Sequence, residues 1–294
     1  MKIGKREFNT DGHCYIMGIL NVTPDSFYDG GRYMDKDACL KRVEAMIAEG
    51  CDILDIGGES TRPGHACISV AEEMERTVPV IESVRQHFEL PISLDTYHAC
   101  VAEAGIRAGA DMINDIWGLR HDAEMAAVIA REQVACCLMH NGRPVDGCNN
   151  RCHPENAGSG GGNDGSRTNA NHDLIVGIKN SLTASVTVAR AAGIAEGRIV
   201  LDPGIGFGKN YEENLHILAH LTELKSPDFP WLLGASRKSV IGEALGLSVE
   251  ERLEGSIVTT VMAVMAGFSF VRVHDIAAHK RAVKMCEAVN NEKI

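Results

Sequence analysis

Short apolar runs alternate with longer amphipathic segments about eight times along this chain, and this alternation limits the folds that it can adopt. The runs are apolar throughout, which is typical of parallel strands covered on both faces. The segments between them carry apolar residues at helical spacing, as between Asp35 and Glu49. We therefore expect an α/β architecture in which each strand is followed by a helix.

Eight runs have the length and composition of strands, at 14–20, 51–56, 91–94, 111–113, 135–139, 198–201, 231–234 and 268–273. The expected helices lie at 35–49, 70–87, 100–108, 123–131, 174–192, 211–221, 249–266 and 276–289. Eight strand–helix units in 294 residues fit a (β/α)₈ TIM barrel that forms a single domain. A doubly wound open sheet is the alternative fold that this pattern leaves open.

One segment departs from the alternation, between Val145 and Asn171. It is rich in Gly, Asn and Ser and has almost no aliphatic residues, which predicts a flexible insertion after the fifth strand. Its Cys148, Cys152 and His153 form a weak candidate for a zinc site, because no fourth ligand is evident. We interpret the segment as a loop on the catalytic side of the barrel, and keep the metal site as the minor alternative.

The net charge and the N-terminal sequence limit the kinds of molecule that this protein is expected to bind. A net charge of −11 argues against a general binder of nucleic acid or anionic membranes, although local basic residues could still bind an anionic substrate. The N-terminus does not resemble a signal peptide, and no run of about 18 apolar residues predicts a membrane span. Ten scattered cysteines without a secretory signal indicate free thiols and a cytoplasmic protein.

Polar side chains follow the expected strands. In a barrel these strand ends meet at one mouth, where polar groups indicate a functional site. Several hydrogen-bond donors and acceptors in a confined space suit a flat heterocycle, and we assign this role to Asp95, Asn114, Asp202 and Lys238.

A second group of polar residues suits an anion. Arg62, Arg272 and His274 offer positive charge and forked donors, which fit phosphate or diphosphate. Asn21 has a neutral oxygen that could complete a Mg²⁺ shell supplied mostly by phosphate and water.

Other residues near the strand ends have simpler interpretations. We expect Asp55 and Asp115 to be turn or helix-cap residues and His121 to lie at the surface. For His140, a packed or backbone-bonded role and a ligand role are both open. The glycine-rich run at 204–208 matches neither a dinucleotide fingerprint nor a P-loop.

The segments that carry these residues resemble the dihydropteroate synthases, folate-pathway enzymes of the pterin-binding family. In chain order, from near residue 15 to residue 275, they read MGILNVTPDSF, DIGGESTRPG, SLDT, INDI, LDPGIGFGK, GASRKS and RVHD. The resemblance implies a (β/α)₈ barrel, Mg²⁺ and usually a homodimer. It also implies a transferase reaction, in which 7,8-dihydropterin-6-ylmethyl diphosphate and p-aminobenzoate give 7,8-dihydropteroate and diphosphate.

The resemblance further implies a role for each matching residue. The pterin would be held by Asp95, Asn114, Asp202 and Lys238. The diphosphate would be held by Thr61, Arg272 and His274, and Mg²⁺ would be contacted by Asn21. The p-aminobenzoate site, where sulfonamides compete in this family, would be bordered by Phe27, Arg62, Pro63, Phe207 and Ser239. The expected catalytic groups are Asp29, which would join on closure of the first loop, with Arg62, Lys238, Arg272 and His274.

On this interpretation the bond between the methylene and the diphosphate oxygen breaks by an SN1-like path. Arg272, His274 and Mg²⁺ would stabilise the leaving group, and Asp95 and Asp202 would favour the cation. The arylamine would then attack as a neutral nucleophile, while closed loops exclude water.

Two other functions are possible for a chain with these motifs. A related pterin-binding methyltransferase is disfavoured by the retained phosphate-binding residues, because a methyl donor has no diphosphate. A non-catalytic pterin-binding paralogue is disfavoured by the intact Asn21, Arg62 and Lys238.

Overall fold

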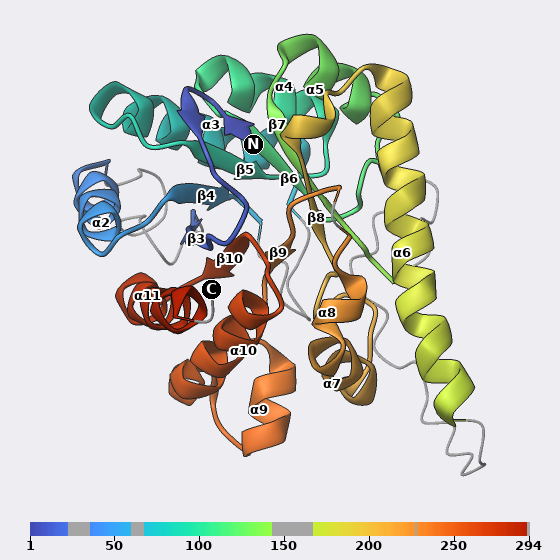
Figure 1. The fold of residues 1–294 in the computed structure, drawn as a ribbon. Helices are drawn as coiled ribbons and strands as arrows, with labels where there is room; N and C mark the ends of the chain where they lie inside the picture. The colour runs from blue at the N-terminus through green and yellow to red at the C-terminus, as the bar shows by residue number, and fades with distance from the viewer. Residues whose placement is uncertain (23–35, 60–67, 143–166, 227, 293–294) are drawn as a thin grey trace.

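The computed structural model describes residues 1–22, 36–59, 68–142, 167–226 and 228–292. Within these ranges a sheet of eight parallel strands is surrounded by helices (Figure 1). The strands are β3 (Tyr15–Asn21), β4 (Ile53–Gly57), β5 (Ile92–Asp95), β6 (Met112–Asp115), β7 (Ala135–Met139), β8 (Ile199–Asp202), β9 (Leu232–Leu233) and β10 (Phe270–Val273). Each overlaps one of the apolar runs, so the expected strands are confirmed.

The sheet closes into a barrel. Neighbouring strands follow the order β8-β7-β6-β5-β4-β3-β10-β9. Leu201 in β8 then forms a parallel bridge with Trp231, just before β9, and the Leu201 N–H donates to the carbonyl of Pro230 at 3.0 Å. An open doubly wound sheet would leave two edge strands unpaired, so the barrel is confirmed and the alternative is excluded.

Eight longer helices alternate with the strands in the described part of the chain: α2 (Lys36–Ala48), α3 (Val70–His87), α4 (Ala99–Ala108), α5 (Met125–Glu132), α6 (Arg167–Ala192), α7 (Tyr211–Ala219), α10 (Leu253–Met265) and α11 (Ile276–Asn291). The short α8 (Leu221–Leu224) and α9 (Ser239–Leu245) add to them, as do the 3₁₀ turns Glu196–Arg198 and Val249–Glu251. No described helix is long and apolar enough to cross a membrane.

The expected extent of the insertion needs one correction. Helix α6 begins at Arg167, so the part of the predicted insertion from 167 to Asn171 is helical. Among the α6 residues whose burial the structure describes, Ile175 is the first buried one. The sequence from 167 to 173 has no apolar period that could have marked the earlier turns. Once nucleated, a helix extends cooperatively over polar residues. Residues 145–166, which include Cys148, Cys152 and His153, lie outside the described residues.

The barrel interior is apolar at the amino-terminal ends of the strands. An antiparallel hairpin of β1 (Lys2–Ile3) and β2 (Arg6–Glu7) precedes the barrel. It places Ile3 and Phe8 against strand side chains that point into the barrel. Phe8 contacts Phe270 and Tyr15 edge to face, with ring centres 5.8 and 4.8 Å apart. The hairpin therefore plugs this end and leaves the carboxyl ends of the strands for polar groups.

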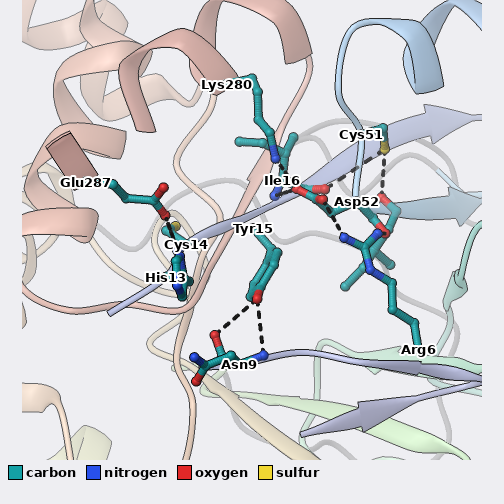
Figure 2. Close-up of polar contacts among 11 residues, drawn as sticks. Arg6, Asn9, His13, Cys14, Tyr15, Ile16, Cys51, Asp52, Lys280 and Glu287 are labelled. Atoms are coloured by element: carbon teal, nitrogen blue, oxygen red, sulfur yellow. Dashed lines mark hydrogen bonds and ion pairs between the residues drawn. The ribbon is translucent and has the colours of Figure 1, made fainter. Parts of the chain in front are cut away.

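A buried carboxylate fastens the plugged end (Figure 2). Asp52 lies just before β4, and its Oδ2 accepts the Ile16 N–H at 2.9 Å and Lys280 Nζ at 2.6 Å. Its Oδ1 accepts Arg6 Nη2 at 3.0 Å. One carboxylate thus connects the hairpin, β3 and α11, and two cations compensate its buried charge.

Candidate active site at the carboxyl ends of the strands

The strand register aligns polar residues in one row. Asn21 of β3 pairs with Gly57 of β4, Gly57 with Asp95 of β5, and Asp95 with Asn114 of β6. A Cβ built on Gly57 would lie 3.5 Å from Cβ of Asp95 and 4.0 Å from Oδ1 of Asn21. The glycine therefore leaves the space between these two polar side chains open.

Arg272, on β10, is the central cation of the site. Its Nε donates to Oδ2 of Asp55 at 2.6 Å, and its Nη2 donates to Oδ2 of Asp95 at 2.6 Å. Burial acts to lower the pKa of Arg272, but the attraction of Asp55 and Asp95 outweighs it and raises the pKa above its usual value. The guanidinium is therefore a fixed positive charge between two carboxylates.

The expectation that Asp55 is a turn or cap residue is wrong. Asp55 lies inside β4 and is fully buried, and its Oδ2 also accepts Nδ2 of Asn114 at 3.4 Å. Arg272 is 217 residues away in sequence, so nothing local identified the partner. The signal that could have been used is the charge itself, since an Asp inside an apolar strand requires a buried partner.

The expectation for Asp115 is confirmed. Its Oδ1 accepts the N–H of Trp117 at 2.8 Å and its Oδ2 accepts the N–H of Leu119 at 2.7 Å. It therefore caps the turn after β6. His121 is exposed, also as expected.

The two carboxylates assigned to the heterocycle, those of Asp95 and Asp202, lie at strand ends and have raised pKa values. Burial raises the pKa of Asp95 to about 7, although Arg272 opposes the shift. Burial likewise raises the pKa of Asp202, against the effect of Lys238. Oδ1 of Asp202 also accepts the N–H of Gly204 at 2.7 Å. Both groups can therefore change charge nearer to neutral pH than an ordinary aspartate, as is common at functional sites.

Lys238 contacts the loop that follows β8. Its Nζ donates to the carbonyl of Ile205 and lies 4.6 Å from the centre of the Phe207 ring. Burial lowers the pKa of Lys238 to about 8, while Asp202 acts to raise it. Carboxylate, ammonium and aromatic face therefore lie together, as a polar heterocycle with an apolar edge would require.

Sequence reasoning missed the role of Lys209. Its Nζ donates to three backbone carbonyls, those of His140 at 3.3 Å, Gly204 at 2.8 Å and Phe207 at 3.0 Å. This ties the end of β7 to the loop that carries Phe207. Burial, assisted by Lys209, lowers the pKa of His140 to about 3, so this imidazole is neutral.

His274 comes directly after β10 and contacts the segment that follows β9. Its Nδ1 lies 3.0 Å from Oγ of Ser236, and its backbone N–H donates to the same oxygen at 3.3 Å. Ser239 is exposed at the first residue of α9.

The described residues bring together most of the residues selected from the sequence. At the carboxyl ends of the strands, or in the segments that follow them, lie Asn21, Asp95, Asn114, Asp202, Phe207, Lys238, Ser239, Arg272 and His274. The other selected residues lie outside the described residues and are Phe27, Asp29, Thr61, Arg62 and Pro63.

The donor set near Asn21 suits a cation that brings most of its own ligands. In the described part of the chain, no group of three or more His, Cys, Asp or Glu could hold a metal ion. Asn21 offers a half-buried neutral oxygen, separated from Asp95 by Gly57 in the strand register. Mg²⁺ keeps several waters and is often held by one or two protein groups plus substrate phosphate, so the residues present fit it.

Comparison with known proteins gives consistent matches. The model of the family described as pterin binding enzyme matches residues 17–274. A dihydropteroate synthase from Clostridium beijerinckii is 47% identical over 98% of this chain and 99% of its own. The chain also resembles the crystal structure of a Clostridium difficile dihydropteroate synthase in the presence of pteroic acid, with 42% identity, a TM-score of 0.83, and 96% and 99% of the chains covered. It also resembles the structure of a Xanthomonas albilineans dihydropteroate synthase with 4-aminobenzoic acid. The identity is 38% and the TM-score is 0.81, over 95% of this chain and 93% of the other.

Proposed function

We propose the following function for this chain, which belongs to the pterin-binding enzyme family, among the dihydropteroate synthases. As a transferase of folate biosynthesis, it joins 7,8-dihydropterin-6-ylmethyl diphosphate to p-aminobenzoate and produces 7,8-dihydropteroate and diphosphate. The observation that carries this proposal is the cluster of polar groups at the carboxyl ends of the strands. There Arg272 donates to Asp55 and Asp95 and interacts electrostatically with Asp202 and Lys238.

The pterin is assigned to four polar groups, the buried Asn114 and Asp202 and the half-buried Asp95 and Lys238. A pterin carries ring N–H and amino donors, which carboxylates accept, and a carbonyl, which an ammonium or amide can bind. Asn114 and Asp202 are almost fully buried, so a ligand without matching atoms would leave them unpaired. This cost gives the subsite its selectivity.

The diphosphate is assigned to the cationic side of the mouth, formed by Thr61, Arg272 and His274. Mg²⁺, contacted by Asn21, would supply additional electrostatic stabilisation of the leaving group. Arg272 presents a permanent charge, and the pairing of His274 with Ser236 orients the imidazole. These groups favour the state in which negative charge has built up on the departing oxygen.

The bond change is proposed to be SN1-like. The methylene–oxygen bond breaks first, and its electron pair leaves with the diphosphate. Asp95 and Asp202 favour the cation on the pterin methylene. The p-aminobenzoate nitrogen then donates its lone pair to the methylene carbon and releases one proton to solvent. No strong general base is needed, because the arylamine is a neutral nucleophile.

The p-aminobenzoate subsite is assigned to the outer part of the mouth. Phe207 supplies an apolar wall for the ring, and Ser239 lies exposed at the start of α9. The remaining groups of this subsite are proposed from the family motifs and are Phe27, Asp29, Arg62 and Pro63. Sulfonamides would compete at this subsite.

We further propose a homodimer that forms on helices α10 and α11, which pack side by side (Figure 1). Val258 and Met265 on α10 are 57% and 48% exposed, and Met285 and Val289 on α11 are 65% and 40% exposed. Their spacing of seven and four residues places each pair on one helix face. An apolar surface of this kind is typical of an interface.

The partners of the enzyme are therefore small molecules and a second copy of the chain, with no nucleic acid and no membrane. We place the protein in the cytoplasm, because seven described cysteines carry free thiols and a reducing compartment maintains them.

The test of the proposed function is an assay of the purified protein with pterin diphosphate, p-aminobenzoate and Mg²⁺. We expect equal amounts of dihydropteroate and diphosphate, and loss of turnover when a chelator removes the metal. Release of diphosphate without dihydropteroate would indicate hydrolysis, and no release would overturn the proposal. Arg272→Met removes the positive charge assigned to the leaving diphosphate and should abolish turnover.

A further inference from the structure

Arg237 has an unusual backbone for a residue with a side chain. It lies between Ser236 and Lys238, and its φ of 58° falls in the left-handed region. That conformation costs an L-residue about 1–2 kcal/mol, and glycine would avoid the cost. A strained residue inside a functional segment indicates that its side chain is required there.

Helix α10 and the residue that precedes it hold the strained backbone of Arg237 on both sides. The Arg237 N–H donates to Oγ of Ser256 at 2.9 Å. The Arg237 carbonyl accepts Nη1 of Arg252 at 3.1 Å. Ser256 and Arg252 are themselves joined, since Oγ of Ser256 donates to the Arg252 carbonyl at 2.7 Å. The conformation of this turn is therefore determined by its surroundings rather than by its own preference.

The Arg237 side chain makes a two-pronged ion pair with Asp275. Nε donates to Oδ2 at 2.9 Å and Nη2 donates to Oδ1 at 2.6 Å. Asp275 precedes the first residue of α11, yet its carboxylate makes no capping hydrogen bond to that helix. The carboxylate is directed to Arg237 instead, and a bidentate pair of this kind fixes orientation as well as distance.

The two ends of this ion pair adjoin the two halves of the site. On one side Arg237 is followed directly by Lys238, which is assigned to the pterin. On the other side Asp275 is preceded directly by His274, which is assigned to the diphosphate. Ser236 contacts His274 in parallel, so two successive residues of one segment are paired with two successive residues of the other.

We propose that Arg237 and Asp275 are a positioning pair, which sets the separation between the pterin subsite at Lys238 and the diphosphate subsite at His274. This inference rests on the proposed function of the same site. Neither residue acts on the substrate. The pair aligns the two subsites so that a pterin and a diphosphate joined by one methylene fit both at once. A misalignment of about 1 Å can lower a rate by about 100-fold.

The competing explanation is that this ion pair only stabilises the fold. The chain offers a matched control at the other end of the barrel, where Arg85 pairs with Asp111 just before β6. The side chains of Arg85 and Asp111 are 27% and 21% exposed, against 29% and 24% for Arg237 and Asp275. Asp111→Asn therefore reproduces the loss of a similar ion pair far from the site.

The experiment uses Arg237→Gly, Asp275→Asn, the double variant and Asp111→Asn, together with wild type. Calorimetry first measures the affinities for free pterin, for inorganic diphosphate with Mg²⁺, and for pterin diphosphate. In Arg237→Gly we expect the affinities for free pterin and for inorganic diphosphate to change less than threefold. The affinity for pterin diphosphate should fall at least tenfold. Glycine relieves the strained backbone, so this variant should keep its melting temperature.

Turnover gives the second readout. We expect kcat to fall at least tenfold in Arg237→Gly and in Asp275→Asn, with little further loss in the double variant. Arg237→Lys should restore part of the loss, because it keeps the charge without the fork. Asp111→Asn should keep kcat within twofold even if it melts earlier.

Two results would overturn the inference. One is an unchanged affinity of Arg237→Gly for pterin diphosphate. The other is an equal loss of kcat in Asp111→Asn, which would make the effect one of stability alone. If wild type binds these ligands but shows no turnover, the proposed function fails, whereas the calorimetric comparison still decides the positioning role.

Discussion

At the scale of single residues, the site contains an acid and a base whose charges change near neutral pH. Burial raises the pKa of Asp95 to about 7 and lowers that of Lys238 to about 8. Arg272 is shifted in the opposite sense to Lys238, because it touches two carboxylates directly and its charge is strengthened. The site therefore combines one permanent cation, suited to a leaving group, with groups suited to holding a heterocycle.

A pH dependence of pterin binding follows from Lys238. Below about pH 8 its ammonium is charged and donates to the ligand, and above this pH the charge is lost. Affinity for free pterin should therefore fall as pH rises through about 8. Calorimetric titrations between about pH 6.5 and 9.5 would measure this. In Lys238→Arg, whose charge persists to much higher pH, the fall should disappear, and an unchanged fall in that variant would show that another group titrates.

At the scale of elements, the loop after β8 depends on close backbone approach at Gly204. Gly204 has a φ of 70°, and a Cβ there would overlap the carbonyl oxygen of His140. The same carbonyl accepts Nζ of Lys209, so displacing it would disturb the loop that carries Phe207. The close approach of Gly204 to the His140 carbonyl therefore affects the position of Phe207, the proposed wall of the p-aminobenzoate subsite.

Gly204→Ala should therefore destabilise the protein by at least about 3 kcal/mol, because strain and overlap add. Gly12→Ala is the matched control, since Gly12 has a φ of 73° and open space around it, and strain alone should cost about 1 kcal/mol. Denaturant unfolding measures both. Equal losses would show that the contact with His140 is unimportant, and a loss of p-aminobenzoate affinity confined to Gly204→Ala would connect it to the site.

The elements differ in how far sequence could predict them. The expected strand at 135–139 matches β7 at both ends, and the expected helix at 70–87 matches α3. Both signals are local: the strand is one apolar run, and the helix has apolar residues at helical spacing. Ser69 also caps α3, because its Oγ accepts the Glu72 N–H at 3.2 Å. Helix α9 was not predicted, because seven residues are too few to establish a period.

The candidate site was predictable to the extent that it lies at strand ends. A barrel places those ends together, whatever the individual contacts are. The pairing of Asp55 with Arg272, and of Arg237 with Asp275, joins positions that are 217 and 38 residues apart. Such pairs depend on strand register and on the direction of side chains, which a single sequence does not reveal.

At the scale of the whole molecule, the two ends of the barrel are specialised. The amino-terminal end is closed by the hairpin, the interior cluster with Phe8, and the charges around Asp52. The carboxyl-terminal end carries the polar row that contains Asp95 and Asn114. Separating stability from chemistry in this way lets the open end retain buried charges that would otherwise weaken the fold.

Helices α10 and α11, on the side of the barrel, are the proposed site of homodimer formation. Val258 and Met285 are the most exposed of the four apolar side chains on α10 and α11. In the proposed homodimer they would lose this exposure, and a stable interface of standard size buries about 800 Å² on each partner. A lysine at either position would place a hydrated charge in the interface, with a cost larger than the contact it replaces.

Val258→Lys and Met285→Lys should therefore convert the dimer to a monomer, which sedimentation or light scattering measures directly. The control is Val176→Lys, because Val176 is an exposed apolar residue, 39% accessible, on the more distant α6. It should leave the dimer intact. The melting temperature of wild type should rise with protein concentration, as association stabilises the folded chain, and that dependence should vanish in Val258→Lys. A wild-type monomer, or a Val258→Lys variant that remains dimeric, would contradict an interface on these two helices.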